Sequence, residues 1–322
     1  MSQRRAIAVD AGGTTSRAVV VDSTGTCLAE AYGGPGNPRS VGGDAAAANI
    51  VGACVAALDQ TDAWPDLFVI TAAGMLSTGG EFPELHVALS QQGLEGLVRL
   101  EPDMLSAYFS ATASPTGSVL IVGTGTTAAR ISNGRVSAVR DGLGWLLGDG
   151  GAGFWIGHQV ARAAARHLDH RGPASSLTQR VEEMTGSIQA DVPGRPPALS
   201  GLIDWAYGVP PVQLARLAPL ALEEANRGDA VASQICDEAA DRILKAVAAL
   251  PGSGAGPVVV GGGVMGPNSP VARRVLAELG ESALRVTDGV VGSAFLAVGM
   301  LGASADEDTR GRIAASLAQV RG

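Results

Sequence analysis

A short pattern of glycines and threonines occurs twice in the chain, each time between two apolar runs of strand length. In the first copy the run 6–9 ends at Asp10, and the turn that follows carries two glycines and two threonines. In the second copy the run 118–122 leads into Gly123-Thr124-Gly125-Thr126-Thr127, and residues 128–131 follow. Apolar runs separated by turn residues predict strands joined by tight turns. The repeated unit therefore predicts two domains that begin in the same way.

The composition of the first turn predicts a site for an anion and a cation. Gly12 and Gly13 let backbone N–H groups approach a ligand without a Cβ in the way. Consecutive N–H groups and the hydroxyls of Thr14 and Thr15 form a concave surface for an anion. The Asp10 carboxylate would repel a bare phosphate, but it suits a divalent cation bound between the two. We therefore expect a phosphate-and-metal loop on a β-hairpin, with an ordinary Gly-rich hairpin as the alternative.

Length, charge and cysteine content limit the class of protein. A chain of 322 residues suits roughly two domains of ~150 residues. The net charge of −8 argues against non-specific binding to nucleic acid or to an anionic membrane. Cys27, Cys54 and Cys236 are widely spaced, so we expect buried free thiols in a reducing cytosol. We find no apolar run near the ~18 residues of a membrane helix and no signal-peptide core, and we expect a cytoplasmic protein.

Strands open each half of the chain, and helices follow and separate the later strands. Asp44 is expected to cap one helix, and Pro102 is expected at the first position of another. This order predicts α/β layers with mixed sheets. We expect an N-terminal domain of residues 1–113 and a C-terminal domain of residues 114–322, whose terminal helix, 304–322, could pack back on the first domain.

Seven short segments are weak motifs alone but specific together in their order and spacing. They are Asp10-Ala-Gly-Gly-Thr-Thr, the Gly36-Asn37-Pro38 loop, Ala73-Gly74, the helix at Asp103, Gly123-Thr-Gly-Thr, Gly144-Trp145-Leu-Leu-Gly-Asp149 and Gly261-Gly-Gly-Val. With them nearly the whole chain resembles the N-acetylglucosamine kinase branch of the BadF/BadG-type ATPase family, in the actin–hexokinase–heat-shock-ATPase superfamily. The resemblance implies an α/β fold of two ribonuclease H-like domains of the actin-like ATPase superfamily, with a nucleotide and sugar cleft between them.

The resemblance also implies ATP and Mg²⁺ as cofactors and a role for each segment. The catalytic base is implied to be Asp103, which accepts the proton of the attacking hydroxyl; the positive end of its helix is expected to favour the ionised form. Asp10 is implied to anchor Mg²⁺ through water. The implied phosphate loops are Gly12, Gly13, Thr14 and Thr15, and Gly123, Thr124, Gly125 and Thr126. The implied adenosine contacts are Gly261, Gly262 and Gly263, and the implied sugar contacts are Asn37, Gly74, Asp103, Trp145 and Asp149.

The sugar pocket departs from the family pattern at two positions. The family usually has Glu after the aspartate of its Gly-Asp-Glu-Gly run, whereas Gly150 follows Asp149 here. Vertebrate relatives carry Asn where Thr127 stands. Trp145 could stack on a sugar or pack in the cleft. These departures leave undecided whether the pocket accepts an N-acetyl group, so free glucosamine is an alternative substrate.

Three other features of the sequence each allow two interpretations. Residues 148–153 match Gly-x-Gly-x-x-Gly, with Asp169 beyond them, but a dinucleotide site needs a clear strand before the glycines, and the preceding residues make a poor one. His167 and His170 lie one helical turn apart, yet the sequence offers no evident third metal ligand. Arg17 could support a phosphate electrostatically or be a solvated strand residue.

The leading functional hypothesis is an ATP-dependent amino-sugar kinase that phosphorylates the C6 hydroxyl of N-acetylglucosamine or glucosamine. Its partner is then a small-molecule amino sugar, and the chain could also form a homodimer. The second hypothesis is an ATPase that acts on a protein partner, like the activators of CoA-ester dehydratases in the same family. Those hold an iron–sulfur cluster through cysteines, and the three cysteines here form no suitable pair. The third is a non-catalytic sugar sensor, against which the retained Asp10 and Asp103 argue.

Overall fold

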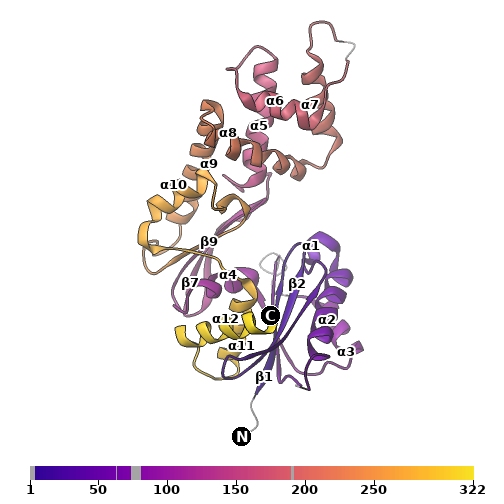
Figure 1. Cartoon of the computed structure of the whole chain (residues 1–322), viewed down its shortest axis with the longest axis vertical. Coiled ribbons are helices and arrows are strands. Elements are labelled where there is room, and N and C mark those ends of the chain that lie inside the picture. The colour runs from indigo at the N-terminus through magenta and orange to yellow at the C-terminus, as the bar shows by residue number, and fades with distance from the viewer. Residues whose placement is uncertain (1–3, 63, 74–80, 190–191) are drawn as a thin grey trace. The chain divides into compact units, whose positions relative to one another are not determined.

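The computed structural model describes residues 4–62, 64–73, 81–189 and 192–322, and the chain forms two compact units (Figure 1). The first unit contains residues 1–117, 131–136 and 284–322, and the second contains residues 118–130 and 137–283. Each unit is built on one five-stranded sheet with helices packed against it. The α/β class with mixed sheets expected from the sequence is confirmed.

The sheet of the first unit has the strand order β3-β2-β1-β4-β5. Its strands are β1 (Arg5–Ala11), β2 (Ser16–Asp22), β3 (Cys27–Gly33), β4 (Leu67–Ala72) and β5 (Leu97–Pro102). The first three strands form the expected antiparallel meander, whereas β4 runs parallel to β1 and β5 runs parallel to β4. Because β1 lies in the middle of the sheet, the turn after it is held by neighbours on both sides.

The two faces of this sheet are covered by different helices. The helices of the unit are α1 (Pro38–Val41), α2 (Gly43–Leu58), α3 (Pro83–Gln91), α4 (Asp103–Ala111), α11 (Gly289–Met300) and α12 (Glu307–Arg321). Alternate residues of β1, among them Ile7 and Val9, belong to the same core cluster as Ile50 and Cys54 of α2. Successive side chains of a strand point to opposite faces, so Asp10 lies on the other face, where α11 packs against β1, β2 and β4.

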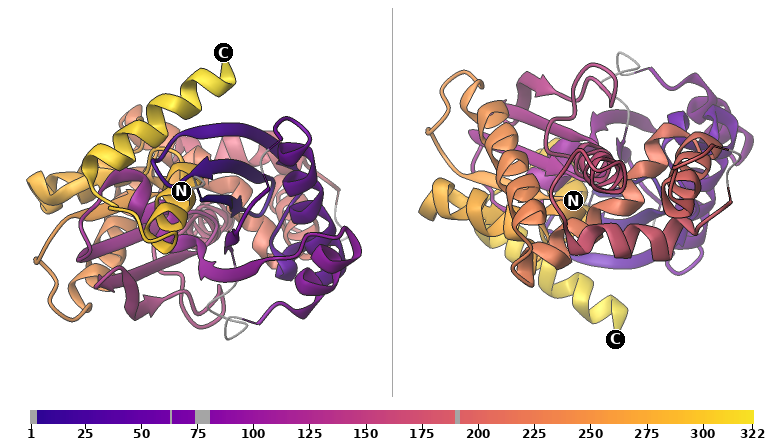
Figure 2. Two further views of the ribbon diagram at one scale, coloured as in Figure 1. Left: turned by 90° about the horizontal axis from the view of Figure 1, so that it is seen from below. Right: turned by 90° about the horizontal axis from the view of Figure 1, so that it is seen from above.

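The end of the chain returns to the first unit. Helix α12 packs along β3, as the yellow helix beside the indigo strands shows (Figure 2). The Arg4 guanidinium donates a hydrogen bond of 2.9 Å to the Leu301 carbonyl oxygen, and the Cys27 thiol donates to the Ile313 carbonyl oxygen over 3.6 Å. The end of the chain, α12 included, is therefore held on the first unit by contacts between residues nearly 300 positions apart.

The second sheet repeats the strand order of the first, β10-β9-β6-β7-β8. Its strands are β6 (Gly117–Val122), β7 (Thr126–Ser132), β8 (Arg135–Asp141), β9 (Val258–Gly261) and β10 (Ala283–Arg285). Strand β6 takes the central place that β1 has in the first sheet, and β9 runs parallel to it, as β4 does to β1. The repeat predicted from the two Gly/Thr turns is thus a repeat of sheet topology.

The helical segments of the second unit surround a large core that includes Ile156, Leu177, Ile235 and Ile243. They are α5 (Gly153–Leu168), α6 (Ser176–Thr185), α7 (Pro197–Gly208), α8 (Ala218–Asn226), α9 (Ala230–Ala248) and α10 (Pro270–Leu279), with the short 3-10 segments η2 (Pro211–Leu217), η3 (Gly263–Met265) and η4 (Gly280–Ser282). None of the helices in the described ranges is both long enough and apolar enough to cross a membrane.

Several details differ from the sequence expectations. Gly42 is the N-cap of α2, so Asp44 lies in the first turn instead of capping the helix. Pro102 ends β5 and precedes α4, which begins at Asp103 itself. All three cysteines are buried free thiols, as expected, and burial raises the pKa of Cys27 to about 11.

Candidate functional site

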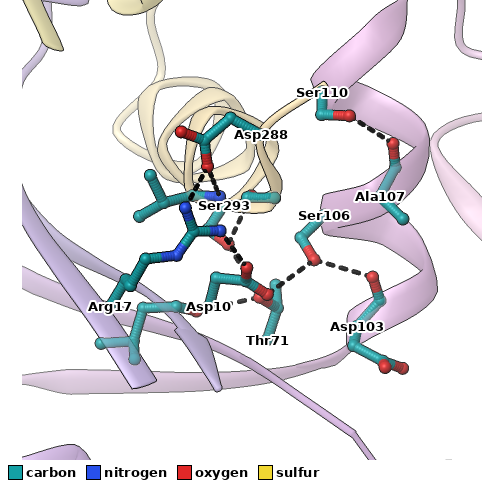
Figure 3. Close-up of polar contacts among 12 residues, drawn as sticks. Asp10, Arg17, Thr71, Asp103, Ser106, Ala107, Ser110, Asp288 and Ser293 are labelled. Carbon is teal, nitrogen blue, oxygen red and sulfur yellow. Dashed lines mark hydrogen bonds and ion pairs between the residues drawn. The ribbon is translucent and has the colours of Figure 1, made fainter. Parts of the chain in front are cut away.

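In the first unit, strand register decides the partners of Asp10. Asp10 lies opposite Arg17 of β2 and beside Thr71 of β4, so the three side chains share one face of the sheet. Arg17 Nη2 donates to Asp10 Oδ2 over 2.8 Å, and Ser106 Oγ donates to Asp10 Oδ1 over 3.3 Å (Figure 3). The ion pair and these neighbours fix the carboxylate at the end of β1, directly before the first Gly/Thr turn.

The first Gly/Thr turn presents its backbone to solvent. The Gly12 N–H donates to the Thr15 carbonyl oxygen over 2.9 Å, which closes the turn, while Gly13, Thr14 and Thr15 are exposed. The Gly36 N–H donates to the Gly12 carbonyl oxygen over 2.9 Å and ties the turn to the next loop. An exposed turn of this kind leaves N–H groups and hydroxyls free to meet an anion.

Asp103 is the first residue of α4 and lies close to Asp10. Ser106 Oγ, one helical turn further on, lies 3.3 Å from Asp10 Oδ1 and 2.7 Å from the Asp103 carbonyl oxygen, and its one proton can go to either acceptor. Burial and the negative charge of Asp10 raise the pKa of Asp103 to about 6, although backbone N–H groups lower it. The start of the helix therefore favours the ionised form, as expected, but desolvation and the second carboxylate outweigh it and the pKa rises.

The other predicted sugar contacts of the first unit are Asn37 and Gly74. Asn37 is the N-cap of α1, and its Oδ1 accepts a hydrogen bond of 2.9 Å from the Arg39 N–H. The cap uses the carbonyl oxygen of the side chain, so the amide NH₂ group remains available to a ligand. Gly74 lies outside the described residues.

In the second unit, the start of α5 fixes the second Gly/Thr turn. The Gly123 N–H donates to the Gly125 carbonyl oxygen over 2.9 Å. The Gly123 and Thr124 carbonyl oxygens accept hydrogen bonds of 2.8 and 3.0 Å from the N–H groups of Gly153 and Phe154. The first turn of the helix thus uses its free donors to hold the loop.

Asp149 supports the same turn from its other side. Its Oδ1 accepts a 3.0 Å hydrogen bond from the Thr126 N–H, and its own N–H donates to Asp141 Oδ1 over 2.6 Å. Burial and the charge of Asp141 raise the pKa of Asp149, while the Thr126 bond lowers it. Trp145 lies in the same loop, is 44% exposed and packs its ring 5.4 Å from that of Phe154. Asp149 Oδ1 is thus used by the turn, whereas the indole keeps an open face.

A pocket of the second unit joins two of the predicted nucleotide segments. It has a volume of about 360 Å³, and Gly123 and Thr124 line it together with Gly263 and Val264, although these pairs are far apart in sequence. Its remaining walls are mainly small or apolar: Gly153, Ala215, Ala218, Pro219 and Leu222. At its edge Gly262 has φ +95°, and a Cβ there would lie 2.3 Å from the Val122 carbonyl oxygen. Only glycine permits β9 and β6 to approach so closely at this point.

The alternative sites receive no support from the described residues. Residues 143–147, before the Gly-x-Gly-x-x-Gly match, form turns and not a strand. His167 Nδ1 lies 2.8 Å from Thr178 Oγ1, and the described part of the chain contains no group of three side chains arranged to hold a metal ion by themselves. The Thr127 side chain packs against Gly142, at the base of the loop that carries Asp149.

The donor chemistry at Asp10 fits a divalent cation that phosphate oxygens also bind. Asp10 Oδ1 accepts one long hydrogen bond, from Ser106, and so keeps lone pairs for a cation or its water. Mg²⁺ is commonly bound by one or two carboxylates and by phosphate oxygens. Asp10 could hold it in that way, with Asp103 as a second negative charge nearby.

Sequence reasoning missed four residues: Ser106 beside Asp10, Asp141 beside Asp149, Asp288, which forms an ion pair with Arg17, and Arg321, which forms an ion pair with Asp288. Ser106 had a signal, because it follows Asp103 by one helical turn. Asp288 also had one, because an aspartate before an apolar helix is a typical N-cap. The partners of Asp141 and Arg321 depend on loop and long-range packing, which the local sequence does not display.

Comparisons with known proteins agree with the repeated fold. Residues 7–303 match the BadF/BadG/BcrA/BcrD ATPase family. The chain is 31% identical over 259 residues to an N-acetyl-D-glucosamine kinase of Dictyostelium discoideum, which covers 76% of this chain and 78% of that protein. It is 24% identical over 250 residues to the glucosamine kinase GspK of Vibrio cholerae, covering 77% of this chain and 81% of that protein.

A solved structure shows the same fold at a greater sequence distance. A Chromobacterium violaceum protein with the provisional name N-acetylglucosamine kinase superposes with a TM-score of 0.70 at 24% identity, over 92% of this chain and 99% of that one. At this identity the likeness concerns the fold alone. The match to the family extends over most of the chain, and the chain belongs to the BadF/BadG/BcrA/BcrD ATPase family.

Proposed function

We propose that the protein is an ATP-dependent amino-sugar kinase that phosphorylates the C6 hydroxyl of N-acetylglucosamine or glucosamine. The observation that carries the proposal is the proximity of Asp103 to Asp10 on one face of the first sheet, beside the first Gly/Thr turn. Phosphoryl transfer depends on positioning and on neutralising charge more than on covalent chemistry. A carboxylate for the incoming hydroxyl and a separate carboxylate for the metal supply both needs.

Asp103 acts as the general base in this proposal. A base works best when its pKa is close to the operating pH but low enough to leave it ionised. With a pKa of about 6, Asp103 is mostly ionised at neutral pH and more basic than an ordinary aspartate. It can therefore accept the proton of the sugar hydroxyl as the hydroxyl oxygen attacks the γ-phosphorus of ATP, while the bond from that phosphorus to the β–γ bridging oxygen breaks and ADP leaves.

The two Gly/Thr turns hold the phosphate groups. The Gly12–Thr15 turn and the Gly123–Thr126 turn offer backbone N–H groups and threonine hydroxyls, and Asp149 keeps the second turn in shape. Asp10 would hold Mg²⁺, which supplies neutralisation of the phosphate charge when bound. The pocket lined by Gly123, Thr124, Gly263 and Val264 takes the adenosine part of the nucleotide, because small and apolar walls suit a purine.

The amino-sugar class comes from the relatives. One is named an N-acetyl-D-glucosamine kinase and the other a glucosamine kinase. Asn37, Gly74, Trp145 and Asp149 are the proposed sugar contacts besides Asp103, and the open amide of Asn37 and the open ring face of Trp145 suit a sugar. We also propose a cytoplasmic location, because buried reduced thiols suit that compartment.

A coupled assay of ADP release over a panel of hexoses and amino sugars tests the proposal. We expect turnover that depends on N-acetylglucosamine or glucosamine and is lost in Asp103→Asn. Asp44→Asn is the matched control, because Asp44 is also a first-turn carboxylate of a helix in the same unit but is exposed. ADP release that needs no sugar would instead favour an ATPase acting on a protein partner. Sugar binding without turnover would favour a sensor.

A further inference from the structure

Five charged side chains of the first unit form an unbroken series of ion pairs from Asp10 to Glu30, and we call this series the charge chain. Arg17 Nη2 lies 2.8 Å from Asp10 Oδ2, and Arg17 Nη1 lies 2.7 Å from Asp288 Oδ1 (Figure 3). Arg321 Nη1 lies 2.8 Å from Asp288 Oδ2, and Arg321 Nη2 lies 2.6 Å from Glu30 Oε1. The order along the chain is therefore Asp10, Arg17, Asp288, Arg321 and Glu30, with alternating sign.

We propose that Arg17 competes with the divalent cation for Asp10, and that Asp288 and Arg321 set the strength of this competition. The inference rests on the proposed function in one respect, the role of Asp10 as the metal anchor. In this view Arg17 is a positioning residue shared between two carboxylates. When a cation binds at Asp10, Arg17 loses one partner and keeps the other, so the cost of the exchange depends on Asp288.

The geometry makes Asp10 the partner that Arg17 can release. Asp288 is the N-cap of α11, and its carboxylate also accepts a hydrogen bond of 3.2 Å from the Val290 N–H, which fixes its position. Asp10 Oδ2 already lies against the backbone of Gly289 at the start of α11, where a Cβ would be only 2.3 Å away, so glycine at this position leaves room for the carboxylate. The same Asp10 carboxylate is therefore held where Arg17 and a cation would meet it.

The alternation of charge predicts effects of alternating sign. Removing the charge of Arg17 leaves Asp10 unneutralised and should strengthen cation binding. Removing the charge of Asp288 leaves Arg17 to Asp10 alone and should weaken cation binding. Removing the charge of Arg321 leaves Asp288 free to draw Arg17 away from Asp10, and should strengthen cation binding again. Side chains that are 19–25% exposed at Asp10, Arg17 and Asp288 keep these interactions only partly screened by water and salt.

The test is the affinity of the full-length protein for Mn²⁺ alone, measured by water-proton relaxation without nucleotide. An Asp10→Asn protein gives the contribution of all other sites, which is subtracted. The variants are Arg17→Gln, Asp288→Asn and Arg321→Gln; asparagine remains a good N-cap at position 288. Arg312→Gln is the matched control, because Arg312 lies on the same helix as Arg321 but bonds Thr24 and Thr309 outside the charge chain. Thermal unfolding checks that each variant is folded.

We expect Arg17→Gln and Arg321→Gln to tighten the Asp10-dependent Mn²⁺ binding and Asp288→Asn to weaken it, each by about threefold or more, with Arg312→Gln unchanged. Shifts of the three variants in one direction, or affinities equal to that of Arg312→Gln, would overturn the proposal. Wild-type protein that turns over an amino sugar while these affinities stay equal would overturn this inference and leave the kinase proposal intact. Absence of sugar-dependent turnover, with the alternating shifts observed, would overturn the kinase proposal and leave this inference intact.

Discussion

Four aspartates show that the role of a residue here is set by its partners and not by its type. Asp10 is ion-paired with Arg17, while Asp103 is half-buried beside Asp10 and has a raised pKa. Asp149 is bonded to the backbone of a turn, and Asp288 caps a helix. The environment of Asp103 yields a carboxylate that is mostly ionised at neutral pH and more basic than an ordinary aspartate, as proton transfer requires.

The pH dependence of catalysis follows from the environment of Asp103. Because the ionised form is the base, kcat/KM should fall about tenfold per pH unit below the pKa of about 6. The measurement is the rate of sugar-dependent ADP release at sub-saturating sugar across pH 5 to 8. Asp44→Asn should keep the same profile, and a profile that stays flat down to pH 5 would rule out Asp103 as the base.

The same pKa predicts that Asp103 destabilises the fold. Its folded pKa of about 6 lies above the ordinary 3.8, so the carboxyl loses its proton less readily in the folded protein than in the unfolded chain. Below pH 3.8 it is protonated in both states and does not lower the free energy of unfolding. As pH rises through 6 the folded protein must also ionise it, and the free energy of unfolding falls by the full cost. Asp103→Asn should therefore raise the free energy of unfolding at pH 7, by about 1–2 kcal/mol after allowance for partial exposure. Urea unfolding should show that this gain shrinks as pH falls to 5. A variant that is less stable at pH 7 would contradict the assignment.

At the scale of elements, the two Gly/Thr turns have the same place in the sheet but different supports. The first is tied through Gly12 to the loop at Gly36, and the second is tied to the start of α5 and to Asp149. The pocket of the second unit also needs β6 and β9 to approach closely at Gly262. The shape of each proposed ligand site therefore depends on backbone contacts as well as on side chains.

Two neighbouring glycines separate backbone fit from pocket lining. Gly262→Ala puts a Cβ against the Val122 carbonyl oxygen at positive φ, and should lower the free energy of unfolding by about 1–3 kcal/mol. Gly263→Ala meets nothing within 4 Å and should change it by less than about 0.5 kcal/mol, while its methyl group enters the pocket wall. Urea unfolding measures the stability of both variants, and the affinity for a non-hydrolysable ATP analogue measures the effect of each on the pocket. Equal stability of the two variants would contradict the close approach of β9 and β6.

At the scale of the whole molecule, one strand order is used twice and the end of the chain returns to the first unit. The local pattern was sufficient to predict the strands of the meander, the Gly/Thr turns and the repeat, because these depend on apolar runs and turn residues. It was not sufficient for Arg17 or Asp288, whose partners depend on strand register and on a helix from the far end of the chain. The raised pKa of Asp103 could not be predicted from the local sequence either, because burial and the charge of Asp10 cause it.

The return of the chain end can be tested through the thiols. Helix α12 covers Cys27: the Cys27 thiol donates to the Ile313 carbonyl oxygen, and its N–H donates to Ser316 Oγ over 3.0 Å. Removing residues 304–322 should expose Cys27 and speed its labelling by a thiol reagent at least about tenfold. Cys236, which lies in the second unit, should stay protected, as mass spectrometry of the labelled peptides would show. Equal labelling of both cysteines would contradict this packing.

The central claim is that Asp103, close to Asp10, directs phosphoryl transfer to a sugar hydroxyl. Phosphorus-31 NMR of wild-type and Asp103→Asn protein with ATP and N-acetylglucosamine or glucosamine tests it most directly, because it identifies the acceptor of the phosphoryl group. We predict a sugar-phosphate resonance that grows with the ADP resonances in the wild type, and its loss in Asp103→Asn although that variant still binds an ATP analogue. Inorganic phosphate formed at the same rate with and without sugar, or a sugar phosphate formed at the wild-type rate by Asp103→Asn, would contradict the claim.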